Sequence, residues 1–109
     1  MSKKVLLDEN MPQPLRLRLV GHTVITATYQ GWAGKANGEL IALAETEKFD
    51  VMVTADQNLS YQQNMQDRKL ALVVLSTPNK KRVLENAPRI LAAVNAAEVG
   101  SYMFVDFGY

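Results

Sequence analysis

The sequence predicts an α/β fold with three layers, a mainly parallel central sheet covered by helices on both faces. Short apolar runs alternate along the chain with longer segments in which apolar residues recur at helical spacing. Strands separated by helices imply right-handed crossovers and parallel neighbours. The 109 residues suit one domain, and no linker or internal repeat divides them. We therefore expect a single domain over residues 1–109.

The first half of the chain is expected to alternate between strands and helices. The apolar run at residues 5–7 predicts a strand buried on both faces. Two prolines in a first turn, an apolar stripe and a terminal glycine predict a helix over residues 11–20. β-Branched residues predict a strand at 22–27. After a glycine-rich loop, an asparagine cap predicts a helix at 38–48, and a further apolar run predicts a strand at 49–54.

The second half continues the same alternation. A polar, glutamine-rich segment predicts a helix at 59–68, and the most apolar run of the chain predicts a strand at 70–75. Apolar residues at helical spacing predict a helix at 83–94, which we expect Pro88 to kink. A shorter strand is expected at 102–107.

Composition excludes several classes of function. The net charge is +1, so any attraction to nucleic acid has to come from a local patch. The chain has no cysteine, which removes disulfide scaffolds, thiol catalysis and thiolate metal sites. The apolar run near the amino terminus is too short for a signal peptide or a membrane span, so we expect a cytoplasmic protein without a membrane partner.

Acidic residues follow two of the predicted strands. Asp8 and Asp56 lie at strand ends, where open parallel sheets collect their binding sites, and Glu39 lies in the first turn of the intervening helix. If the first and third strands are neighbours, the three carboxylates can converge. Two carboxylates about 4 Å apart repel by roughly 4 kcal/mol at an effective dielectric of 20, which favours a bound proton or a divalent cation. Mg²⁺ or Mn²⁺ is the hypothesis, with phosphodiester hydrolysis as the reaction.

Each of the two aspartates, Asp8 and Asp56, is followed two residues later by an asparagine, Asn10 or Asn58. These amides are candidates to hydrogen-bond the ligand carboxylates or a phosphate oxygen. A structural interpretation of the same acids stays open: an Asp after a strand often caps a helix, and a Glu in a first turn complements the helix dipole.

Three segments together resemble a family. They are VLLDENMP at residues 5–12, GWAG at 31–34 with NGEL at 37–40, and VTADQNL at 53–59. In this order and spacing they look like the small single-domain PIN-like proteins of prokaryotes, a domain family of unknown function, and the likeness covers nearly the whole chain.

The wider PIN group consists of metal-dependent nucleases, including VapC-type toxins of toxin–antitoxin pairs. The resemblance therefore implies a PIN-like fold and a ribonuclease that cleaves single-stranded RNA with Mg²⁺ or Mn²⁺. It matches Asp8 and Asp56 to metal-ligating acids and Glu39 to the helical acid, as a ligand or as a water-orienting base. It also implies a small antitoxin-like protein as partner.

The sequence departs from the wider group after the strand at 70–75, where a further acid is common. Here STPN is followed by Lys80, Lys81 and Arg82. These cations are candidates to hold RNA phosphates beside the metal, and a solvated basic turn is the alternative. Lys35 has the same two interpretations. Trp32 is a candidate to stack on an unpaired base or, alternatively, a packing residue.

Other functions stay open at this point. Because the further acid after the strand at 70–75 is missing, the chain is alternatively a catalytically inactive PIN-like module that binds nucleic acid or protein. A flavodoxin-like phospho-acceptor domain is a third hypothesis, because its acids also lie at strand ends, with Lys80 as the one candidate for its late lysine. The apolar residues 102–105 are a candidate for pairing with another subunit at a sheet edge, which makes a homodimer a further hypothesis.

Overall fold

The computed structural model describes residues 2–57 and 68–108. Within these, five parallel strands form one sheet in the order β2-β1-β3-β4-β5. The strands are β1 (Lys4–Leu7), β2 (Thr23–Thr26), β3 (Val51–Thr54), β4 (Ala71–Leu75) and β5 (Tyr102–Val105). The strands expected near residues 5–7, 22–27, 49–54, 70–75 and 102–107 are thus present. The first and third strands are neighbours, which the hypothesis of converging acids required.

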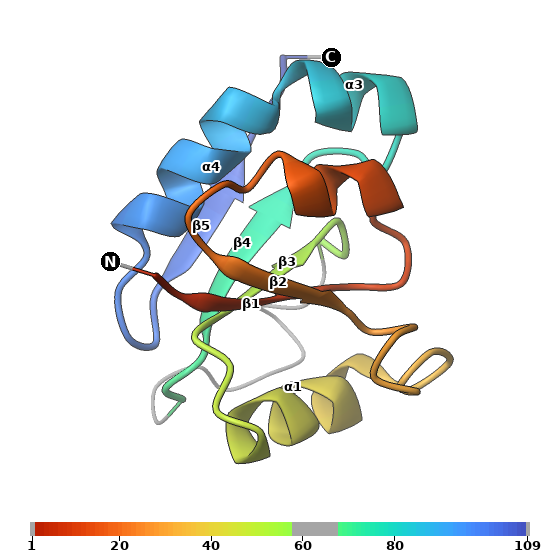
Figure 1. The fold of residues 1–109 in the computed structure, drawn as a ribbon, viewed down its shortest axis with the longest axis vertical. Helices are drawn as coiled ribbons and strands as arrows, with labels where there is room; N and C mark the ends of the chain where they lie inside the picture. The colour runs from red at the N-terminus through yellow and green to blue at the C-terminus, as the bar shows by residue number, and fades with distance from the viewer. Residues whose placement is uncertain (1, 58–67, 109) are drawn as a thin grey trace.

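Helices cover both faces of the sheet, as the α/β prediction requires. Figure 1 shows α3 (Lys80–Glu85), α4 (Ala87–Ala96) and the 3-10 helix η1 (Gln13–Leu17) on one side, and α1 (Asn37–Thr46) on the other. Alternate strand residues point to opposite faces and build two buried clusters. One packs Leu7 and Val73 against α3, α4 and η1. The other packs Leu6 and Leu72 against α1.

The connection from β4 to β5 differs in hand from the other two connections that the structure describes. The β1–β2 and β4–β5 connections pack on the same face of the sheet, since Leu15 and Ile90 belong to one buried cluster. In the strand order, however, β2 lies on one side of β1 whereas β5 lies on the other side of β4, so the two connections run across the sheet in opposite directions. The β2–β3 connection packs Leu40 on the other face and runs opposite to β1–β2, so those two share a hand.

The expectation that every crossover is right-handed, as about 98% are, is therefore wrong for at least one connection. The physical reason lies in the short η1 helix. The η1 helix spans only five residues, so it leaves apolar side chains of β4, such as Val73 and Leu75, uncovered on its face of the sheet. Helices α3 and α4 bury these side chains, and the β4–β5 connection therefore passes over that face.

Two predicted helices are also wrong in detail. The helix expected at 11–20 is only the 3-10 helix η1, which begins at Gln13 with Pro14 in its first turn, and Gly21, with φ of 88°, ends the segment. The helix expected at 83–94 is two helices that meet at Asn86, and Pro88 lies in the first turn of α4 rather than at a kink.

The helix expected at 38–48 is present as α1. The helix expected at 59–68 falls almost wholly outside the described residues. In the described part of the chain, no helix has both the length and the apolar character needed to cross a membrane.

Candidate metal and nucleic-acid site

Asp8 lies directly beyond β1, at the carboxyl edge of the sheet. Its backbone N–H donates to the Val53 carbonyl at 3.0 Å and so continues the pairing of β1 with β3. The side chain is only 8% exposed. Its Oδ1 accepts from the Glu9 N–H at 2.8 Å, and its Oδ2 accepts from the Thr54 hydroxyl at 2.7 Å. A carboxylate has about four lone-pair sites, so these two bonds fix its orientation and leave acceptor capacity.

Asp56 follows β3 by two residues and is half-buried. Its backbone N–H donates to the Thr54 hydroxyl oxygen at 3.1 Å. The fully buried Thr54 hydroxyl therefore donates to Asp8 and accepts from Asp56, which links the ends of β1 and β3. The chain leaves β1 toward one side of the sheet and continues from β3 to the other, so these residues lie at the topological switch point, where open α/β sheets bind ligands.

Glu39 lies apart from this pair. It occupies the first turn of α1, its side chain is 58% exposed, and its Oε2 is 3.8 Å from the Lys35 Nζ. Such an exposed pair contributes at most about 1 kcal/mol. Within residues 2–57 and 68–108, no three His, Asp or Glu side chains are grouped closely enough to hold a metal ion. The Asp8 carboxylate and the Asp56 backbone are thus joined through the Thr54 hydroxyl, and Glu39 is not part of this group.

Sequence reasoning missed two residues of this region. Thr54 is the polar residue that ends an otherwise apolar strand, and that position was the available signal. Glu9 accepts from the Gly34 N–H at 2.9 Å through Oε1, which ties the glycine-rich loop to the end of β1. Gly34 has φ of 85°, a conformation that a side chain disfavours.

Of the two candidate asparagines, Asn10 belongs to the described residues and Asn58 does not. Asn10 is exposed, two residues beyond Asp8. Asn58 lies outside the described residues.

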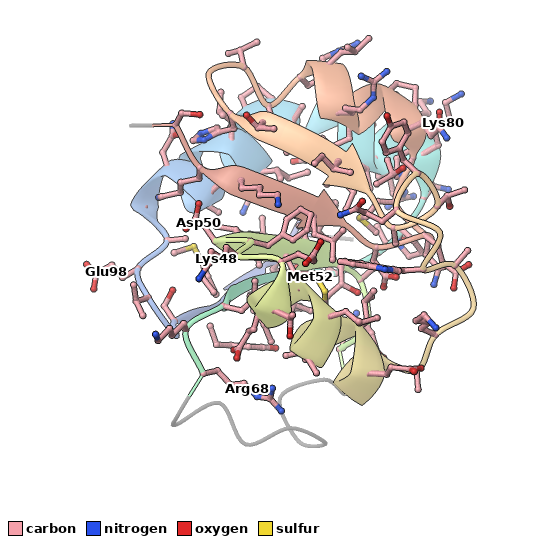
Figure 2. All side chains as sticks on the ribbon, turned by 60° about the horizontal axis from the view of Figure 1, so that its bottom comes forward. Lys48, Asp50, Met52, Arg68, Lys80 and Glu98 are labelled. Atoms are coloured by element: carbon pink, nitrogen blue, oxygen red, sulfur yellow. The ribbon has the colours of Figure 1, made fainter. Side chains whose placement is uncertain are left out.

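The cationic run follows β4 at the same edge of the sheet. Lys80 and Lys81 are exposed in the first turn of α3, and Asn79 caps that helix by accepting from the Arg82 N–H at 3.1 Å. Cations at a helix N-terminus oppose its dipole, by about 0.3 to 1 kcal/mol each, so helix stability does not explain the two lysines. Figure 2 shows Lys80 at the far end of the molecule from Lys48 and Asp50, which precede β3.

The loops after β3 and β4 are joined. The Gln57 Nε2 donates to the Ser76 carbonyl at 2.8 Å. Because Gln57 follows Asp56 directly, this bond ties the acidic loop to the segment that leads into the cations of α3.

Trp32 has a packing role. Its ring centroid lies 6.0 Å from that of Phe49, at an interplanar angle of 65°, and the side chain packs against the cluster under α1. This edge-to-face contact agrees with the interpretation of Trp32 as a packing residue.

Comparison of the chain with protein-family models, with curated proteins and with solved structures found no match. The fold is a three-layer α/β fold, and the PIN-like resemblance stays a prediction.

Proposed function

We propose that the protein is a Mg²⁺- or Mn²⁺-dependent ribonuclease that cleaves phosphodiesters of single-stranded RNA, as the toxin component of a toxin–antitoxin pair. The observation that supports the proposal most is the Asp8 carboxylate. It is nearly buried at the switch point of the sheet and is hydrogen-bonded through Thr54 to Asp56. Carboxylates in such positions are ligands for hard cations.

The donor set present fits Mg²⁺ or Mn²⁺. Mg²⁺ in proteins commonly takes one or two carboxylates and completes its shell with water and substrate phosphate oxygens. Asp8 and Asp56 supply two carboxylates, and the Thr54 hydroxyl holds Asp8 in one orientation, as groups behind a metal ligand do. The chemistry that such an ion supplies is polarisation of a phosphoryl oxygen and a lower pKa for its bound water.

Glu39 has the role of a third ligand or of a water-orienting base. Its present partner, Lys35, is a weak surface pair, so a change of side-chain rotamer frees the carboxylate at small cost. Asn10 and Asn58 are proposed to hydrogen-bond the ligand carboxylates or a phosphate oxygen.

The RNA backbone is proposed to lie over the cations after β4. Lys80, Lys81 and Arg82 follow the strand next to β3, so phosphates bound there lie on the edge that carries Asp8. Lys35 adds a cation from the loop before α1. Stacking of a base on Trp32 is the less supported contact, because its ring already packs on Phe49.

Cleavage of single-stranded RNA with added Mn²⁺ tests the proposal. The wild type is expected to cut, and Asp8→Asn is expected to lose nearly all activity. Asp50→Asn is the matched control: like Asp8, the Asp50 carboxylate accepts one backbone N–H, that of Lys4 at 2.8 Å, but Asp50 lies at the amino end of β3. Equal cleavage by wild type and Asp8→Asn defeats the role of Asp8.

A second candidate is a catalytically inactive PIN-like module that binds nucleic acid or a protein. The observation in its favour is the lack of a three-residue acidic or histidine group in the described residues, together with a cationic run where a further acid is common. Calorimetry separates the two candidates: Mn²⁺ or RNA binding without cleavage favours the module. A neighbouring gene for a short DNA-binding protein favours the toxin pair.

The strand order β2-β1-β3-β4-β5 is also that of flavodoxin-like domains, which keeps the phospho-acceptor hypothesis as a third candidate. Lys80 lies after β4, and β5 is followed by Asp106 rather than by a lysine. Stable labelling of Asp56 by acetyl phosphate would favour this candidate over the ribonuclease.

A further inference from the structure

The strand β5 leaves one edge of the sheet open. Its one strand neighbour among the described residues is β4. Three consecutive large apolar side chains on it are partly exposed: Tyr102 at 39%, Met103 at 36% and Phe104 at 44%. Exposed edges are protected by shortness of the strand, by lysine, by proline or by a bulge; β5 has only four residues but carries no lysine, proline or bulge. Three exposed apolar side chains on an open edge favour pairing with another strand.

The backbone of β5 presents a regular set of free donors and acceptors. The Ser101 and Val105 carbonyls accept from Leu72 and Ser76 of the β4 segment, at 2.8 and 3.1 Å. Along a strand, alternate residues direct both backbone groups to the same side. Met103 therefore also faces β4, and the N–H and C=O groups of Tyr102 and Phe104 face the open edge.

We propose that a second copy of this chain covers this edge, with the two β5 strands antiparallel about a twofold axis at Met103. In this register Tyr102 pairs with Phe104 of the partner subunit, and each such pair exchanges two backbone hydrogen bonds. The register is self-complementary, as a twofold interface requires. Both side chains lie on the face of Leu72 and Val74, so the pairing sets aromatic rings opposite each other across the strands.

The other face of the edge is hollowed where the register places Met103. A shallow, open hollow of about 350 Å³ lies there between α4 and β5, lined on the helix by Arg89, Ala92, Ala93 and Ala96 and on the strand by residues 103–105. Met103 forms a pair without backbone hydrogen bonds, in which opposite side chains approach most closely. The hollow beside the small alanines gives the partner's Met103 room to pack.

The expected association is weak. With roughly 200 Å² for a whole large side chain, the exposed parts of the three residues total about 240 Å² per protomer. Stable interfaces bury about 800 Å² per partner, so we expect a weak dissociation constant, between about 10 and about 300 µM.

Sedimentation velocity over a concentration series from about 10 to about 500 µM, which brackets that affinity, tests the proposal. The average mass of the wild type is expected to rise from that of one chain toward that of two. Val20→Lys is the control, since Val20 is a 68% exposed apolar residue that precedes β2, at the opposite edge of the sheet, and it should associate like the wild type. A wild type that stays monomeric throughout, or a control that fails to associate, overturns the proposal.

Position 103 tests the register itself. Met103→Lys and Met103→Glu each place like charges opposite one another and should be monomeric, whereas their equimolar mixture should dimerise. If the mixture stays monomeric, the register is wrong.

A cysteine at position 103 tests the same register without introducing a charged side chain. The chain has no cysteine, so Met103→Cys has a single thiol. Opposed residues of such a pair lie within disulfide range. Oxidised glutathione should therefore convert it to a covalent dimer, with two thiols oxidised per disulfide. Val20→Cys, which lies before β2 at the opposite edge of the sheet, should stay uncrosslinked; equal crosslinking of the two variants contradicts the proposal.

Discussion

The Thr54 hydroxyl donates to Asp8 Oδ2 at 2.7 Å and thereby joins the ends of two neighbouring strands. The same hydroxyl oxygen accepts from the Asp56 N–H at 3.1 Å. One buried side chain thus orients the first acid and holds the backbone that carries the second. The proposed site depends on this link.

Replacing Thr54 by valine keeps the shape of the side chain and removes the hydroxyl. Hydrogen bonds to a charged group contribute about 1.5 to 3 kcal/mol, so Thr54→Val should lower the free energy of unfolding by about 2 kcal/mol. Thr54→Ser keeps the hydroxyl and should lose only about 0.8 kcal/mol for one methyl group. Urea denaturation measures both. A serine variant that is no more stable than the valine variant would show that the hydroxyl is not important.

The cations of α3 should act on RNA affinity rather than on stability. Lys80→Gln with Lys81→Gln should weaken binding of single-stranded RNA and reduce the salt slope by about 1.4, or about 0.7 per phosphate contact. The control is Lys48→Gln with Lys69→Gln, the same change of charge at exposed positions that precede β3 and β4. Fluorescence anisotropy over a salt series measures the slopes. Equal loss in both double variants would attribute binding to net charge alone.

The role of Trp32 can be separated from RNA binding. Because Trp32 packs edge-to-face on Phe49 and is partly buried, Trp32→Ala should destabilise the fold by about 2 kcal/mol, less than a fully buried tryptophan. Tyr29→Ala removes an aromatic side chain that is 83% exposed and should change stability by less than about 0.5 kcal/mol. Equal denaturation midpoints for the two variants would contradict the packing role.

The strands were predictable because their signal is local. Apolar runs such as residues 71–75 are buried along their whole length, and only a parallel sheet covered on both faces offers that environment. The position of Asp8 beside β3 then followed from the adjacency of the first and third strands. The sequence could not show that Thr54 links the two acidic loops, because that contact joins residues far apart in the chain.

The helices were less predictable because competing local effects decide them. The segment at 11–20 forms only η1, with Pro14 in its first turn and Gly21 beyond its end, although its apolar spacing is helical. Pro88 starts a new helix because the missing N–H costs nothing in a first turn. The hand of the β4–β5 connection depends on which face of the sheet is left uncovered, a property of the assembled fold. The exposed position of Glu39 likewise depends on how α1 docks.

The most direct test of the metal site is a titration with Mn²⁺, followed by electron paramagnetic resonance of the free ion. We expect the wild type and Asp50→Asn to bind Mn²⁺ with equal affinity, and Asp8→Asn and Asp56→Asn each to lose at least tenfold in affinity, about 1.4 kcal/mol. Equal binding by all four proteins, or no binding by folded wild type at millimolar Mn²⁺, would contradict a shared cation between Asp8 and Asp56.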